Sequence, residues 1–229
     1  MPDLTITVEG LEDVLAGRTL AGLRVLEVGP KYGVHSRWLD GQGAAELVFC
    51  DFASDADLHA AWAPSLVTPH RFVYGDLRTA GELFDLPPFD VVFFLGVLYH
   101  SAHHLPLLAT LNRVTKLGGT MLLETTFDPR PEASVRLRWH PESGKAKAVP
   151  TLDALRVMLA WTGWRNVTRF TEYRPSSTEV IFLCQKTDEL APETEFAPVV
   201  RPHRLPVPEP EPIAPVAKVD TVETSDPSF

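Results

Sequence analysis

The residues best suited to chemistry begin in the segment LRVLEVGPKYGVH, residues 23–35. Its apolar run at 25–28 ends on Gly29, and Gly33 opens a segment with helical character at 36–39. A buried parallel strand that turns at a glycine into a helix presents backbone N–H groups to a nucleotide-like ligand. Glu27 lies one residue inside the strand end, where a carboxylate is costly unless a cation or a hydrogen-bond donor meets it. The segment therefore predicts a ligand-binding turn beside an acid.

Two further acids close the next two apolar runs. Asp51 ends the run AELVFCDF, 18 residues beyond Gly33, where an acid can hold a pair of ribose hydroxyls. Asp76 follows the run RFVY, where it could receive an adenine amino group. Either acid alone could simply cap or solvate a loop. Because three strands in sequence end on Gly29, Asp51 and Asp76, an adenosyl ligand is favoured.

The spacing of the glycines separates the possible adenosyl ligands. Dinucleotide binding requires G-x-G-x-x-G, and the stretch from Gly29 to Gly33 lacks the central glycine that lets a pyrophosphate approach the backbone. A ligand without phosphates fits this turn better.

Strands alternate with helices along most of the chain, which places these acids in one sheet. Apolar runs at 25–28, 45–52, 71–74, 89–95 and 120–126 alternate with helical patterns at 36–39, 55–63, 79–84 and 104–116. Gly118 and Gly119 are expected to stop the last of these helices. This alternation predicts an α/β protein, a Rossmann-like, doubly wound sheet that is mostly parallel.

The end of the predicted domain has a different connection. A helix at 151–163, with Thr151 as N-cap, precedes strands at 166–173 and 179–186. The link between these strands is too short for a crossover helix, so the last of the seven strands must run antiparallel to the one before it.

Over residues 20–186 this pattern resembles the class I S-adenosylmethionine-dependent methyltransferases. The resemblance implies that S-adenosylmethionine is the cofactor and that its methionine portion is held by Glu27, Gly29 and Gly33. It also implies that Asp51 holds the ribose, and that Asp76, with Leu77 beside it, holds the adenine. The sequence departs from the family at 30–32, where Pro, Lys and Tyr replace the usual small residues.

The segment GVLYH and the later LLET are similar to those of a narrower group, the tRNA wobble-uridine carboxymethyl-transferases and their small-molecule methyltransferase relatives. The resemblance implies that Leu95 and Gly96 offer backbone carbonyls to the cofactor amino group. Tyr99 matches a tyrosine that in the tRNA enzymes helps to hold a carboxylated cofactor. We expect the chain to lack the long N-terminal extension of those enzymes, and their other carboxylate-binding residues have no identified counterparts in the sequence. Together with the absence of a basic surface, this predicts ordinary S-adenosylmethionine as the cofactor.

His100 is the predicted general base. It follows the fourth strand, at the edge where such a sheet binds ligands, and a hydroxyl nucleophile needs a base that titrates near neutrality. The alternative is that His100 caps the next helix. Glu124, a carboxylate inside a core strand, could orient the substrate or a histidine, or could pair with Arg113 or Lys116.

The sequence predicts no metal site. His100, His103 and His104 form an HxxHH cluster, but no carboxylate follows at ligand spacing.

Residues 127–150 read as a long irregular stretch rich in Pro, Arg and charged residues, and a loop of this length is usually functional or mobile. Within it, Arg138, Trp139 and His140 are the candidate substrate contacts, because aromatic and Arg side chains give shape and anchoring.

Composition narrows the functional classes. The net charge of −9 includes −6 from residue 187 onward, and no clustered Lys and Arg mark a nucleic-acid footprint, so nucleic acid is an unlikely partner. The first residues do not resemble a signal peptide, and no run is long enough to span a membrane, which predicts a cytoplasmic protein. Cys50 and Cys184 are expected to be buried free thiols. Residues 1–186 form the predicted methyltransferase domain, and the Pro-rich acidic residues 187–229 a disordered tail.

The function predicted from the sequence is methyl transfer to a hydroxyl of a small molecule, such as a sugar or a natural product. The alternatives are a tRNA wobble-uridine modifying transferase and a non-catalytic methyltransferase-like scaffold.

Overall fold

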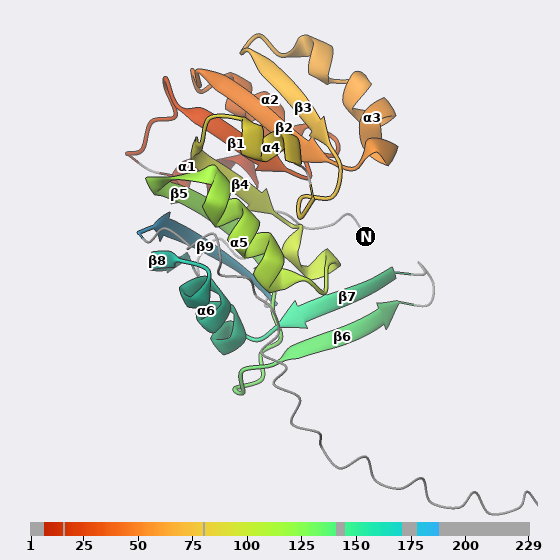
Figure 1. Cartoon of the computed structure of the whole chain (residues 1–229), viewed down its shortest axis with the longest axis vertical. Helices are drawn as coiled ribbons and strands as arrows, with labels where there is room; N and C mark the ends of the chain where they lie inside the picture. Colours follow the sequence, from red (N-terminus) through yellow and green to blue (C-terminus); the bar gives the residue numbers. More distant parts are fainter. Residues whose placement is uncertain (1–6, 16, 80, 141–144, 171–177, 188–229) are drawn as a thin grey trace, which may run out of the picture. The chain divides into compact units, whose positions relative to one another are not determined.

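A seven-stranded sheet with helices on both faces forms the centre of the computed structural model (Figure 1). The structure describes residues 7–15, 17–79, 81–140, 145–170 and 178–187. The strand order is β3-β2-β1-β4-β5-β9-β8. This order confirms the predicted α/β, Rossmann-like fold. The strands are β1 (Arg24–Val28), β2 (Glu46–Asp51), β3 (His70–Tyr74), β4 (Phe89–Leu95), β5 (Thr115–Thr126), β8 (Trp164–Phe170) and β9 (Glu179–Lys186).

The directions of the strands also follow the prediction. β1 to β5 pair in parallel, whereas β9 runs antiparallel to both β5 and β8. The carboxyl ends of β1 to β5 therefore meet at one edge of the sheet, which is where open α/β sheets bind ligands.

Two apolar cores cover the two faces of the sheet. On one face, buried leucines of α4, α5 and α6 pack against alternate strand residues such as Leu26 and Val92. On the other face, residues of α1 and α2 and the side chain of Trp62 pack against Val25 and Phe93. The helices are α1 (Val8–Val14), α2 (Val34–Asp40), α3 (Ala56–Ala60), α4 (Gly81–Asp85), α5 (His104–Val114) and α6 (Leu152–Trp161), with short 3₁₀ turns η1 (Ala53–Asp55), η2 (Ala63–Ser65) and η3 (Leu98–His100).

Helix ends differ from the predictions where tertiary pairing overrides local signals. Helix α6 begins as expected, because the Thr151 hydroxyl accepts a hydrogen bond from the backbone N–H of Ala154 at 3.3 Å. Helix α5, however, ends at Val114, before Gly118 and Gly119, which lie inside β5. The predicted helix at 55–63 is split among η1, α3 and η2.

The prediction of an irregular stretch at 127–150 is wrong for much of its length. Strands β6 (Val135–His140) and β7 (Lys145–Pro150) pair there as a separate two-stranded antiparallel sheet (Figure 1). The backbone N–H of Asp128 donates to the carbonyl of Pro150 at 2.8 Å, which ties the hairpin to the segment that follows β5.

Two sequence predictions fall outside the described residues. Nearly all of the Pro-rich tail at 187–229 lies there, and so does the link at 171–177 before β9. Within the described part, no helix is long and apolar enough to cross a membrane.

Candidate active site

Glu27 is a buried carboxylate at the end of β1. Its side chain is 4% exposed, and its Oε2 accepts a hydrogen bond of 2.7 Å from the Ser36 hydroxyl in the first turn of α2. Burial raises the pKa of Glu27 to about 7, against the lowering effect of the Ser36 hydrogen bond, and the nearby charge of Asp51 raises it further. A carboxylate in this position gains stability when a cation approaches it.

Gly29 and Gly33 occupy positions that exclude a side chain. Both have positive φ angles, 72° and 68°. A Cβ on Gly29 would lie 2.8 Å from Cγ2 of Val97, and one on Gly33 would lie 2.3 Å from the indole of Trp62. The turn after β1 is therefore restricted to glycine for steric reasons as well as for its backbone conformation.

The residues between these glycines are anchored by Trp62. The indole Nε1 donates to the carbonyl of Lys31 at 3.0 Å, and Lys31 has a φ of 47°. Tyr32 is 59% exposed, with its ring 5.2 Å from Nζ of Lys31. Residues 30–32 replace the small residues usual in the family. Here the indole of Trp62 binds the backbone of Lys31, and the Tyr32 side chain faces largely outward.

Asp51 lies at the centre of a hydrogen-bonded group at the end of β2. Its Oδ1 accepts from the backbone N–H of Phe52 at 2.8 Å, and its Oδ2 accepts from that of Lys31 at 3.4 Å. The same Oδ2 lies 3.1 Å from Nε2 of His59, whose Nδ1 lies 3.2 Å from the Tyr74 hydroxyl. The aspartate is therefore oriented by both the β1 turn and a buried histidine.

His59 is itself fixed by packing. Its side chain is 1% exposed, and its ring stacks on Phe72 at a centroid distance of 4.9 Å and on Tyr74 at 5.7 Å. His59 is not among the site residues predicted from the sequence. No local pattern marks it, because its role depends on the pairing of β2 with β3.

Asp76 follows β3 and forms an ion pair with Arg78. Nε of Arg78 lies 2.9 Å and 3.0 Å from the two carboxylate oxygens, and the Arg78 backbone N–H donates to Oδ1 at 2.9 Å. Hydrogen bonding from the Arg78 side chain, opposed by burial, lowers the pKa of Asp76 to about 2. Asp76 is therefore ionised at neutral pH, and Leu77 beside it is buried.

The end of β4 supplies backbone groups and two aromatic rings. Gly96 has a φ of 69°, and its N–H donates to the carbonyl of Glu124 at 3.1 Å, next to the buried Leu95. In η3, Tyr99 is buried and His100 is exposed, with 4.3 Å between their ring centroids. Helix α5 begins at His104 with His103 as its N-cap residue, so His100 does not hold the capping position considered from the sequence.

Glu124 lies in the core near the end of β5. It is 1% exposed and stands between Leu95 of β4 and Ile181 of β9. The suggested ion pair with Lys116 is wrong, because Lys116 binds Asp90 at 2.6 Å near the other end of the strand.

The three candidate substrate contacts lie on β6. Trp139 is 64% exposed, and Nη2 of Arg138 lies 3.8 Å from Oδ2 of Asp128. His140 ends the strand, and its side chain is outside the described part of the structure. Sequence analysis missed Lys147 of β7, whose ammonium lies 4.5 Å from the Tyr99 ring centroid. The period-two alternation of apolar and basic residues in VRLRWH was the available signal for this hairpin.

The described residues contain no cluster of three or more His, Cys, Asp or Glu side chains that could hold a metal ion. Cys50 and Cys184 are buried free thiols, as expected, and burial raises the pKa of both, to about 12 for Cys50.

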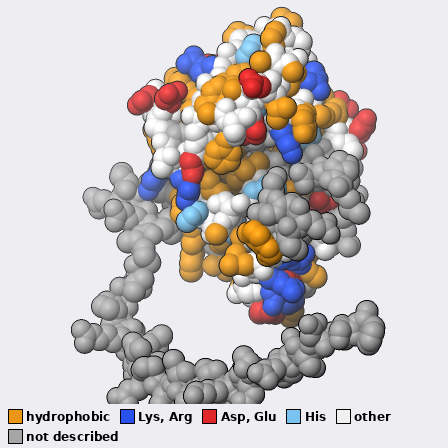
Figure 2. Space-filling view, turned by 90° about the vertical axis from the view of Figure 1, so that its right-hand side faces the viewer, with side chains coloured by type: hydrophobic (Ala, Val, Ile, Leu, Met, Phe, Trp, Pro, Cys, Tyr) orange, Lys and Arg blue, Asp and Glu red, His pale blue; other side chains and the backbone are white. Residues whose placement is uncertain are grey.

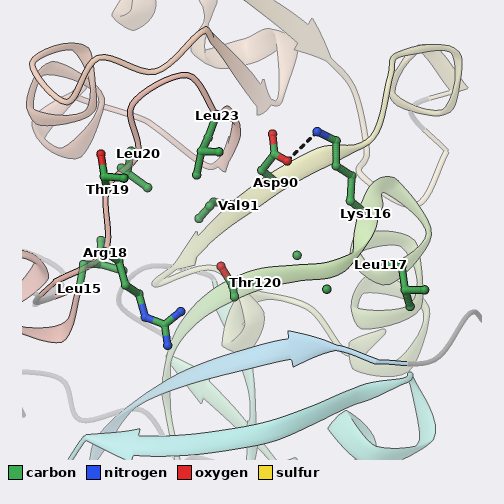
Figure 3. Close-up of a pocket in the computed structure, with 12 residues that line it drawn as sticks. Leu15, Arg18, Thr19, Leu20, Leu23, Asp90, Val91, Lys116, Leu117 and Thr120 are labelled. Atoms are coloured by element: carbon green, nitrogen blue, oxygen red, sulfur yellow. Dashed lines mark hydrogen bonds and ion pairs between the residues drawn. The ribbon is translucent and has the colours of Figure 1, made fainter.

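A cavity of about 360 Å³ lies at the opposite end of the sheet (Figure 3). The cavity is lined by Leu23, just before β1, by Val91 near the amino end of β4, and by Thr120 in the middle of β5. The Asp90–Lys116 ion pair lines it as well. The cavity is therefore separate from the edge where Glu27, Asp51 and Gly96 meet.

Comparison with known proteins agrees with this architecture. A family model described as a methyltransferase domain matches residues 9–169. The tRNA U34 carboxymethyltransferase of Pseudoalteromonas translucida is 31% identical over 153 residues, which cover 65% of this chain and 46% of that protein. The enzyme of the same name from Marinobacter nauticus is 31% identical over 162 residues, which cover 64% and 45%. The chain thus spans about half the length of the curated relatives it matches.

Solved structures share the fold at lower identity. The 1,6-didemethyltoxoflavin-N1-methyltransferase of Burkholderia thailandensis, with bound S-adenosylhomocysteine, aligns with a TM-score of 0.59 and 17% identity, covering 78% of this chain and 75% of that one. The N-terminal domain of EvdMO1, in the presence of S-adenosylhomocysteine and D-fucose, aligns at 0.56 and 19%, covering 78% and 80%. The chain therefore shares its fold with these structures and belongs to the methyltransferase domain family.

Proposed function

We propose that this methyltransferase acts on a hydroxyl oxygen of a small molecule, with His100 as the general base. The observation that carries the proposal is the position of His100, an exposed imidazole in η3, directly after β4 at the carboxyl edge of the sheet. Methyl transfer to a neutral hydroxyl requires a group at that edge to accept the hydroxyl proton.

The residues around the β1 turn fit the cofactor. Glu27 is a buried acid that a cationic amino group would stabilise, and Gly29 and Gly33 have no side chains of their own, with Val97 and Trp62 packed against them. We infer that these residues take the methionine portion, together with the backbone at Leu95 and Gly96.

The adenosine portion has a complementary set of residues. Asp51 is oriented by His59 at the end of β2, where its carboxylate suits a pair of ribose hydroxyls. Asp76 is ionised and accepts hydrogen bonds, which suits the adenine amino group, and Leu77 adds a buried apolar neighbour.

When bound, S-adenosylmethionine supplies an electrophilic methyl group. The protein's own tasks are then to align the acceptor oxygen, to exclude water and to remove a proton. Tyr99 packs its ring against His100, which restricts the orientation of the imidazole. His100 takes the hydroxyl proton. Glu124, buried one strand away at the same edge, is the candidate for orienting the acceptor or the histidine.

The β6–β7 hairpin is the proposed acceptor-binding element. Its strand β7 packs against η3, as the contact between Lys147 and Tyr99 shows. Arg138 and Trp139 on β6 offer a charged and an aromatic contact to a substrate, and His140 follows them in the sequence.

A tRNA substrate is the second candidate, because the curated relatives are tRNA U34 carboxymethyltransferases. The net charge of −9 opposes it. On the face shown in Figure 2, Lys and Arg side chains stand in small separate groups beside acidic and hydrophobic ones. A small-molecule acceptor is therefore preferred.

A methyl-transfer assay separates the two candidates. The purified chain is incubated with S-adenosylmethionine labelled in the methyl group, with a panel of sugars, sugar phosphates and phenols, and separately with total tRNA. The proposal expects label in a small molecule, in an alkali-stable methyl ether. Label found only in the nucleosides of digested tRNA would overturn it.

A further inference from the structure

Among the side chains that the structure describes, one face of the β6–β7 hairpin carries three cations. Residues two apart in a strand share a face, so Arg136 and Arg138 point to the same side of β6. Lys147 of β7 pairs directly with Arg138, and directly paired residues of an antiparallel ladder also share a face. Two like charges are thus placed opposite each other, an arrangement that disfavours the hairpin unless an anion lies between them.

Asp128 neutralises this group only in part. Its Oδ1 is engaged by Arg130, with Nε at 3.0 Å. Its Oδ2 lies 3.8 Å from both Arg136 and Arg138, and this buried oxygen accepts no hydrogen bond from the described residues. Arg130 also pairs with Glu132 at 3.3 Å. Two guanidinium groups therefore share one oxygen at a distance too long for hydrogen bonding, and both retain N–H donors for another acceptor.

The cationic face lies beside the proposed active site. Asp128 follows β5 directly, and its backbone binds Pro150 at the end of β7, so the base of the hairpin is fixed to the carboxyl edge of the sheet. Lys147 lies over the ring of Tyr99, and that ring packs against the imidazole of His100. One aromatic ring, that of Tyr99, therefore lies between Lys147 and the candidate base.

We propose that Arg138 and Lys147, with Arg136 beside them, form an anion-binding subsite that holds a phosphate or carboxylate group of the methyl acceptor. The inference rests on the proposed function, because it places the acceptor beside His100. It narrows the acceptor to an anionic small molecule. Guanidinium groups suit both anions because their paired N–H groups match two oxygens.

A single anionic group fits better than a nucleic-acid backbone. The described side chains of the site are three cations on one face of a short hairpin, whereas a polyanion requires a longer track of positive charge. The opposite face of β6 carries the uncharged residues Val135, Leu137 and Trp139.

Titration with simple anions tests the subsite. The protein is saturated with S-adenosylhomocysteine, and inorganic phosphate and acetate are titrated separately at constant ionic strength, with calorimetric detection. We expect one of the two anions to bind with a millimolar Kd, and its identity assigns the group. Arg138→Gln and Lys147→Gln should each weaken that binding at least tenfold.

Arg156→Gln is the matched control, because Arg156 is an exposed arginine that pairs with Asp153 on α6. It should leave anion binding unchanged.

Anion binding that is unchanged in Arg138→Gln would overturn the subsite, as would the absence of binding by both anions. Binding of tRNA that is lost in Arg138→Gln, with no binding of the free anions, would overturn it in favour of a polyanion. S-adenosylhomocysteine binding serves as the separate readout. If the wild-type chain does not bind S-adenosylhomocysteine, the proposed function itself fails. If every variant binds S-adenosylhomocysteine but anion binding is absent or unchanged, only the anion-binding subsite fails.

Discussion

Nε2 of His59 lies 3.1 Å from Oδ2 of Asp51, inside a stack of aromatic rings. The family resemblance predicts that Asp51 binds the ribose, but the orientation of its side chain depends on a histidine eight residues away that no motif marks. Asp51 also accepts a hydrogen bond from the turn after β1, so this contact couples two parts of the proposed cofactor site.

Replacing His59 with Phe should weaken cofactor binding while preserving the ring stack. The variant removes one hydrogen-bond partner of Asp51, a loss of about 1–3 kcal/mol for a buried group. We expect the Kd for S-adenosylhomocysteine to rise at least tenfold, as measured by calorimetry. His70→Asn is the control, since His70 is exposed and contacts the carbonyl of Thr68. Equal affinities of the two variants for S-adenosylhomocysteine would show that His59 does not contribute to cofactor binding.

Glu27 should make the stability of the ligand-free protein depend on pH. Burial raises the pKa of Glu27 from 4.5, its ordinary value in an unfolded chain, to about 7 in the folded chain. Between pH 4.5 and pH 7 the folded state therefore binds more protons than the unfolded state. The free energy of unfolding therefore falls as pH rises from 4.5 to 7, by roughly 3 kcal/mol from this group. Urea unfolding at pH 5 and pH 8 measures the change. Glu27→Gln should flatten that part of the profile, and a variant with the wild-type slope would contradict the assignment.

Gly33→Ala should destabilise the fold more than a glycine replacement that meets no neighbour. Both Gly33 and Gly22 have positive φ angles, 68° and 73°, but only at Gly33 would a Cβ meet the indole of Trp62. We expect Gly22→Ala to cost about 1–2 kcal/mol from the backbone alone, and Gly33→Ala to cost more. Equal losses in urea unfolding would show that the contact with Trp62 is unimportant.

His100→Ala should lower turnover about 100-fold, the effect of a lost general base. The affinity for S-adenosylhomocysteine should be unchanged, because His100 is not among the proposed cofactor ligands. His103→Ala, in an exposed residue of the same loop, controls for general disturbance of the loop. The assay uses the acceptor identified in the labelling screen. Wild-type turnover in His100→Ala would exclude it as the base.

Local patterns were enough to predict the central sheet. The apolar runs that became β1 to β4 are short, are bounded by turn residues and end on or next to the acids or glycines of the site. The antiparallel β9 followed from one physical limit, the length of its connection. Because the acids follow parallel strands, their place at the carboxyl edge of the sheet could be predicted, whereas the order of the strands comes from the structure.

Other features depend on contacts that a sequence does not display. Residues 127–150 were read as irregular because their prolines and charges obscured a period-two strand pattern. β5 begins before Gly118 because Thr115 pairs with Phe89 of β4 across an irregularity in register. His59, Trp62 and Lys147 contact the candidate site only after the chain has folded, so no local signal could assign them.

Calorimetric titration of S-adenosylhomocysteine into the wild-type chain and into Asp51→Ala tests most directly the central claim, that the carboxyl edge of the sheet holds S-adenosylmethionine. The wild-type chain should bind one equivalent, and Asp51→Ala should bind at least tenfold more weakly with its fold intact. Absence of binding by the wild-type chain, or equal affinity in the variant, would contradict the account.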